Sequence, residues 1–245
     1  MALRVYTNWE NRSTDDGKKI EPYRKYYFIC EGRNTERWYF EKFISLRKEF
    51  HINALIDIRY LEKEGIISGC SDPDSLYGLA TQVITKGEYE FDKEYDKIVI
   101  VFDVDIYVTG GRTWNEYESL VQNATNEFIF GITNPGFELF LLLHYPNSLV
   151  EIILPNEECI LRNEKVMAED GYEKIRYIES VFRRRAGFKP KRNQENIEDL
   201  VQNVMIAIKQ EAKVNGNINE CKDKITSNIG RILKMIMDDG GQSSL

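Results

Sequence analysis

Cysteine is scarce and scattered in this chain of 245 residues. The four cysteines stand at positions 30, 70, 159 and 221, and none belongs to a CxxC pair. Disulfide frameworks and zinc sites place their cysteines at close, repeated spacings, so this pattern argues against both. We expect reduced thiols and a cytoplasmic protein.

Long apolar runs are also missing. No stretch of about 18 apolar residues occurs, and the N-terminal sequence MALRVYTNWENRSTDDGKK has no apolar signal core. With 42% hydrophobic and 30% charged residues, the composition is ordinary for a globular protein. The sequence therefore predicts no membrane segment.

Positive charge is in deficit, because the formal net charge is −7. Phosphate contacts require Lys and Arg, so the total opposes nucleic-acid binding. The stretch RRRAGFKPKR nevertheless gathers six basic residues around Phe188, which suits a nucleic-acid groove with a stacking face. The alternatives to a nucleic-acid groove are a solvated turn between helices and an interface with an acidic protein. The candidate nucleic-acid-binding residues are Arg183, Arg184, Arg185, Lys189, Lys191 and Arg192.

The first part of the chain alternates strand and helix patterns. Continuous β-branched or aromatic runs such as KIVIVF predict buried strands, and apolar residues at helical spacing predict the helices between them. This order predicts an α/β fold with a mainly parallel, Rossmann-like sheet flanked by helices. The expected strands are 24–30, 54–60, 97–102 and 128–132, and the expected helices are 35–50, 75–86, 114–125 and 135–145.

Three regions differ in texture. The polar N-terminus predicts a flexible arm, the strand-rich part predicts the catalytic core, and the last part predicts a mainly helical extension. Their bounds are 1–22, 23–150 and 151–245, with helices of the extension expected near 168–185, 195–213 and 220–237.

Acidic residues follow two of the predicted strands at once. Glu31 follows the strand that ends at Cys30, and Asp103 and Asp105 follow KIVIVF. Ligands of open α/β sheets collect beyond the carboxyl ends of the strands, and residues two apart in extended chain point to one side. Such oxygen donors suit Mg²⁺ or Mn²⁺. Turn chemistry, an aspartate-dependent phosphatase and the metal-binding DxD of a glycosyltransferase are the alternatives.

Three sequence blocks, in order, resemble one family. CEGRNTERWYF (30–40), VFDVD (101–105) and TNPGFELFLLLHY (133–145) are similar to the blocks of RloB-like proteins, Toprim-domain proteins of restriction and phage-defence loci that are related to OLD-type nucleases. The resemblance covers about residues 24–145. It implies a Toprim-like fold and a Mg²⁺- or Mn²⁺-dependent nuclease whose metal is held by Glu31, Asp103 and Asp105.

The resemblance also adds Glu36 and Glu138 to the catalytic residues. Glu36 could instead complement the dipole of its helix. Glu138 is a lone acid in a very apolar helix, expected to begin at Asn134-Pro135, so it needs a partner. His144 at the end of that helix fits a dipole contact better than a catalytic role.

The resemblance further implies partners and a setting. It predicts an ABC- or AAA-type ATPase encoded nearby (RloA-like), a DNA or RNA substrate that could be tRNA, a homodimer, and an abortive-infection role in anti-phage defence. The alternatives are a non-catalytic Toprim-fold subunit that assembles with an ATPase or senses a nucleotide and, third, a phosphatase with Asp103 as nucleophile.

Overall fold

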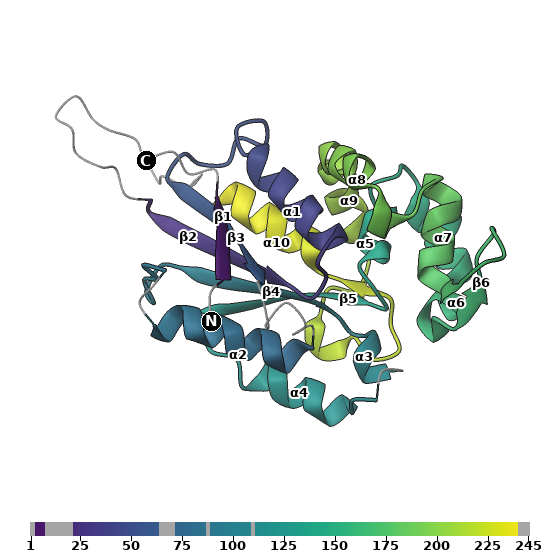
Figure 1. The fold of residues 1–245 in the computed structure, drawn as a ribbon, viewed down its shortest axis with the longest axis horizontal. Coiled ribbons are helices and arrows are strands. Elements are labelled where there is room, and N and C mark those ends of the chain that lie inside the picture. Colours follow the sequence, from purple (N-terminus) through teal and green to yellow (C-terminus); the bar gives the residue numbers. More distant parts are fainter. Residues whose placement is uncertain (1–2, 8–21, 64–71, 87–88, 109–110, 240–245) are drawn as a thin grey trace.

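A mixed sheet organises the molecule (Figure 1). The computed structural model describes residues 3–7, 22–63, 72–86, 89–108 and 111–239. In this part the main sheet has six strands in the order β1-β3-β2-β4-β5-β8. The four central strands are parallel, as the sequence predicts, and the two edge strands are antiparallel. The strands are β1 (Leu3–Thr7), β2 (Arg24–Cys30), β3 (Ile56–Lys63), β4 (Lys97–Asp103), β5 (Phe128–Asn134) and β8 (Thr226–Ser227).

Helices cover both faces of the sheet, which explains why β4 and most of β2 are continuous apolar runs. One face carries the helices α2 and α4 with the single turn α3. The other face carries α1, α5 and α10, with α8 and α9 beyond them (Figure 1). The α/β fold with a mainly parallel sheet is thus confirmed. The bounds are α1 (Thr35–Ser45), α2 (Pro73–Thr85), α3 (Asp105–Val108), α4 (Trp114–Gln122), α5 (Glu138–Leu142), α8 (Gln194–Leu200), α9 (Val204–Glu211) and α10 (Ile229–Asp238).

The N-terminal arm differs from the expectation where the structure describes it. Residues 3–7 form β1, which pairs antiparallel with β3, whereas the sequence predicts a flexible arm over 1–22. This short edge strand has no neighbouring strand in the sequence to signal its pairing, so the polar composition of the region misleads. Residues 8–21 lie outside the described part.

The C-terminal extension is less separate than its sequence suggests. Its strand β8 pairs with β5, and its last helix α10 packs on the sheet. The helix expected over 168–185 is partly a hairpin, β6 (Lys165–Met167) and β7 (Lys174–Arg176), followed by α7 (Tyr177–Ala186). Short elements complete the region: a π-helix Leu149–Ile153, α6 (Glu157–Arg162), and 3₁₀ turns Leu154–Asn156, Pro190–Arg192, Val201–Asn203 and Ile218–Glu220.

The buried helix after β5 begins later than predicted. Asn134 is the last residue of β5, and α5 starts at Glu138. Instead of capping a helix, the Asn134 side-chain amide donates to the carbonyls of Cys221 (2.8 Å) and Lys224 (3.0 Å). These bonds tie the end of β5 to the C-terminal region. No helix in the described ranges is long and apolar enough to cross a membrane.

Candidate active site

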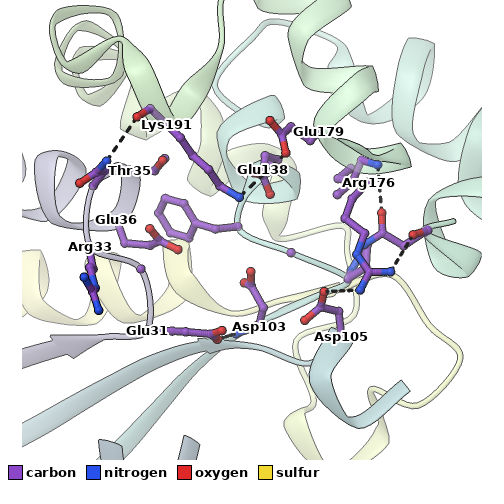
Figure 2. Close-up of a pocket in the computed structure, with 17 residues that line it drawn as sticks. Glu31, Arg33, Thr35, Glu36, Asp103, Asp105, Glu138, Arg176, Glu179 and Lys191 are labelled. Carbon is purple, nitrogen blue, oxygen red and sulfur yellow. Dashed lines mark hydrogen bonds and ion pairs between the residues drawn. The ribbon is translucent and has the colours of Figure 1, made fainter. Parts of the chain in front are cut away.

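The five acids predicted as catalytic residues line one cavity (Figure 2). The cavity has a volume of about 320 Å³ and lies beyond the carboxyl ends of β2 and β4. The sheet places two of the acids and the helices α1, α3 and α5 place the other three. They are Glu31, Glu36, Asp103, Asp105 and Glu138.

Backbone pairing fixes the two acids at the strand ends. β2 and β4 are parallel neighbours, and the Glu31 N–H donates to the carbonyl of Val101 (2.9 Å). In return, Oε2 of Glu31 accepts the N–H of Asp103 (3.1 Å). The Thr133 hydroxyl on β5 donates to Oδ1 of Asp103 (2.6 Å). The carboxylates are therefore held in fixed orientations, with Oδ2 of Asp103 left toward Gly136.

Gly136 leaves a space between two carboxylates. A Cβ at this position would lie 3.2 Å from Oε2 of Glu138 and 3.5 Å from Oδ2 of Asp103. Any other residue would place a methylene group beside both oxygens. The glycine thus keeps open a small, oxygen-lined space of the kind that a hard divalent cation occupies.

Gly32 makes room for Glu36. A Cβ on Gly32 would lie 1.8 Å from Oε2 of Glu36, so the carboxylate rests directly against the glycine backbone. Gly32 is not needed for a left-handed backbone, because the described glycines with positive φ are Gly111, Gly171 and Gly187. The space that Gly32 provides therefore belongs to the second acid of the CEGRNTE block.

Asp105 is placed by a helical turn and not by extended chain. It begins α3, while the preceding Val104 is buried in the core as expected. Its Oδ2 lies 3.8 Å from Nη2 of Arg176, a residue at the end of β7. Asp105 thus faces the C-terminal wall of the cavity as well as the strand ends.

Burial raises the pKa of every acid in this cluster, and neighbouring carboxylates add to the rise for Glu31, Asp103 and Glu138. Burial is the largest cause for each, and the pKa values of Glu31 and Glu138 rise to about 7. For Asp103 the carboxylates of Glu31 and Asp105 add to the effect of burial, and its pKa lies well above the usual range. Such a cluster binds protons near neutral pH, or a divalent cation that replaces them.

Three residues of the cavity wall are not among the catalytic or metal-binding residues that the sequence predicts. Arg176, Glu179 and Lys191 reach it from β7, α7 and the turn after α7 (Figure 2). Lys191 belongs to the predicted basic stretch, but nothing in the local sequence of Arg176 or Glu179 signals this position. The Lys191 Nζ lies 3.9 Å from Oε2 of the mostly buried Glu179.

The basic stretch does not form one surface. Arg183 donates to Glu179 (2.5 Å) and Glu173 (2.8 Å), and Lys189 donates to Asp170 (2.7 Å) and Glu173. The guanidinium groups of Arg184 and Arg185 lie over the rings of Tyr177 and Tyr145. Of the six predicted nucleic-acid-binding residues, Lys191 alone lines the cavity.

The donor set fits Mg²⁺ or Mn²⁺ in its chemistry. One carboxylate oxygen each of Glu138 and Asp103 lies near Gly136, and oxygen donors are the ligands these ions prefer. As the side chains stand, however, no three His, Cys, Asp or Glu of the described residues converge closely enough to hold an ion. Cation binding therefore requires small side-chain movements.

Comparison with known proteins identifies the family of the chain. The family model described as RloB-like protein matches residues 26–236. The chain belongs to the RloB-like family. The RloB-like match includes the acid-bearing strand ends and also the wall that carries Arg176 and Lys191. No curated protein and no solved structure matches the chain.

His144 lies outside the site. It is fully buried, its Nε2 is 2.8 Å from the Tyr39 hydroxyl, and its Nδ1 is 3.0 Å from the Phe140 carbonyl. With Nδ1 donating to the carbonyl and Nε2 accepting from the hydroxyl, the neutral ring satisfies both groups. Burial accordingly lowers its pKa to about 4. His144 therefore connects α5 and α1 structurally.

Proposed function

We propose that this RloB-like chain is a metal-dependent nuclease that hydrolyses phosphodiester bonds in DNA or RNA. The observation that carries the proposal is the meeting of five acids from β2, β4 and three helices in one cavity, faced by cationic side chains from the C-terminal region. A site for phosphodiester hydrolysis needs both: carboxylates for the metal and cations for the phosphate.

Four of the five acids have a role that follows from their contacts. Glu31, Asp103 and Asp105 would hold the ion, which, when bound, polarises the phosphodiester and activates water. Thr133 and the Asp103 N–H orient the first two carboxylates. Glu138, whose pKa is about 7, can take up a proton at Oε2 at neutral pH, which is what a general base requires.

Variants of the strand-end acid test the proposal. The wild type and Asp103→Asn would be expressed with the ATPase encoded nearby, and labelled DNA, RNA and tRNA would be incubated with Mn²⁺. We expect cleavage by the wild type and loss of about 10³-fold or more in Asp103→Asn, because an ion ligand is lost. Glu151→Gln, on the exposed surface away from the cavity, serves as the control. Equal cleavage by Asp103→Asn would refute the assignment.

Control by an ATPase and a role in anti-phage defence are part of the proposal. Both follow from the RloB-like family and its setting in defence loci. An exposed apolar surface with Val150 (62% exposed) and Met205 (52% exposed) supports docking of a protein partner. Loss of cleavage when the ATPase is omitted would support the dependence.

A second candidate is a non-catalytic subunit that assembles with the ATPase or senses a nucleotide. It is favoured by the absence, among the described residues, of three side chains already placed to hold an ion. Titration with Mn²⁺ separates the two. Binding below millimolar concentration that is lost in Asp103→Asn supports the nuclease, and no binding at that concentration supports the second candidate.

A further inference from the structure

Opposite the acids, the cavity has a cationic wall. Arg176 stands at the junction of β7 and α7, and Lys191 lies in the turn Pro190–Arg192. Both line the same cavity as Asp103 and Glu138 (Figure 2). Arg176 and Lys191 thus come from the C-terminal region, as does Glu179, whereas Arg33, a third cation at the cavity, lies just before α1.

The ion pairs of these two cations are loose. Arg176 is 3.8 Å from Asp105, and Lys191 is 3.9 Å from Glu179, distances too long for a hydrogen bond. In the same region, Arg183 and Lys189 make contacts of 2.5–2.9 Å with their acids. Arg183 and Lys189 are therefore committed to the fold. Arg176 donates through Nη1 to the Asn163 carbonyl (3.4 Å), and its remaining donors, like the Lys191 ammonium, make no hydrogen bond to a carboxylate within the described residues.

A buried hydroxyl without a partner among the described residues belongs to a residue that lines the same cavity, on its Lys191 side (Figure 2). The Oγ1 of Thr35 is buried and has no hydrogen-bond partner in the described residues, although Thr35 lines the cavity. The preceding Asn34 does not cap α1 with its side chain but donates to the carbonyl of Lys191 (3.3 Å). An unpaired buried donor is costly, and a ligand that accepts from it removes the cost.

These observations share one ligand. Two cations, an unpaired hydroxyl and the uncapped first turn of an 11-residue helix all favour an anion with several acceptor oxygens. Resting on the proposed function, we infer that Arg176, Lys191 and Thr35 bind a phosphate group of the substrate, with Arg176 and Lys191 held on Asp105 and Glu179 until it enters.

The inference also explains why the acids do not yet converge. A phosphate that engages Arg176 would compete with the 3.8 Å ion pair between Arg176 and Asp105. A phosphate and a divalent ion then favour each other's binding, and the coupling is reciprocal. Such substrate-assisted completion would keep the site inactive without nucleic acid.

Binding in EDTA tests the wall without any cleavage. Fluorescein-labelled single-stranded DNA and RNA would be titrated by anisotropy against the wild type, Arg176→Gln, Lys191→Gln and Thr35→Val. We expect each charge substitution to weaken binding about tenfold and to reduce the salt slope by about 1. The exposed residues Arg162 and Lys209, outside the cavity, provide the matched controls Arg162→Gln and Lys209→Gln, expected to change affinity less than about twofold.

The possible results separate clearly. The inference would be overturned if both charge variants, shown to be folded by far-ultraviolet circular dichroism, bound with wild-type affinity. It would also be overturned if the wild type bound none of the probes: the two oligonucleotides, ATP and tripolyphosphate. Binding of ATP alone, lost in the same variants, supports the phosphate site and identifies a nucleotide as its source. If oligonucleotides bind through Arg176 and Lys191 but are never cleaved, the phosphate-site inference is supported and the nuclease proposal is refuted. Restoration of binding by Arg176→Lys excludes a folding defect.

Discussion

Replacing Glu138 by Gln should stabilise the metal-free protein at alkaline pH. The side chain lies beside Asp103 across Gly136, and burial raises its pKa from the usual 4.5 to about 7. The pKa of Glu138 is thus higher in the folded than in the unfolded state. The stability that its protonated form contributes is fully present below pH 4.5 and is lost as the pH rises through 7. Glutamine keeps the shape of the side chain and removes this loss.

The magnitude follows from the shift. A rise from 4.5 to about 7 corresponds to about 3 kcal/mol, which we reduce to about 2–3 kcal/mol because Glu138 is partly accessible from the cavity. For a chain of 245 residues this equals an increase in melting temperature of about 4–10 °C at pH 8. The same variant should differ little from the wild type at pH 4.5, where both side chains are neutral.

Urea unfolding in EDTA, followed by tryptophan fluorescence at pH values from 4.5 to 8.5, measures the difference. Glu151→Gln changes the same residue type on the exposed surface and should give a flat difference. Addition of Mn²⁺ at pH 8 should stabilise the wild type more than Glu138→Gln, because a bound ion relieves the repulsion. A pH-independent difference, or a wild type more stable than the variant at pH 8, would refute the reasoning.

Three further predictions concern the surroundings of the acids. In Gly32→Ala the new Cβ would displace the Glu36 carboxylate, the end of a flexible side chain, so we expect a loss of no more than about 1 kcal/mol in urea unfolding. Gly78→Ala, with open space around it, should not lose stability. Thr35→Val removes a buried hydroxyl that has no partner among the described residues. The variant should raise the melting temperature of the ligand-free protein and weaken phosphate binding. A lower melting temperature would contradict this prediction. The buried His144 should stay neutral down to about pH 4, so its ring resonances in NMR should show no titration at pH 6.5. The free energy of unfolding should fall between pH 6.5 and 4, because in this range only the unfolded chain takes up the proton.

The strand ends were predictable because local pattern determines them. KIVIVF is β-branched and continuous, so it reads as a strand buried on both faces, and parallel strands bring their carboxyl ends to one edge. These two facts place Glu31 beside Asp103 with no knowledge of the rest of the fold. Glu138 was located through its motif, although its helix is shorter than the apolar pattern indicates.

The C-terminal wall could not be predicted in the same way. Arg176 reaches the cavity because the β6–β7 hairpin and α7 pack beside α5, and this packing leaves no periodic signal in the sequence. RRRAGFKPKR reads as one basic surface because its charges are adjacent. In the fold, acids from the β6–β7 hairpin and α7 engage Arg183 and Lys189, and only Lys191 turns to the site.

The distribution of charge would let a chain of net charge −7 bind a polyanion at this cavity. A few cations suffice if they line the cavity and their carboxylate partners are not in hydrogen-bond contact. Arg176 and Lys191 lie 3.8 and 3.9 Å from their acids, whereas Arg183 of α7 lies 2.5–2.8 Å from its two acids. Because β8 completes the sheet and the turn at Lys191 is tied to Asn34, the wall is also part of the core structure. Residues 151–245 should therefore be required for substrate binding as well as for folding, and a chain cut after residue 150 should not retain either property.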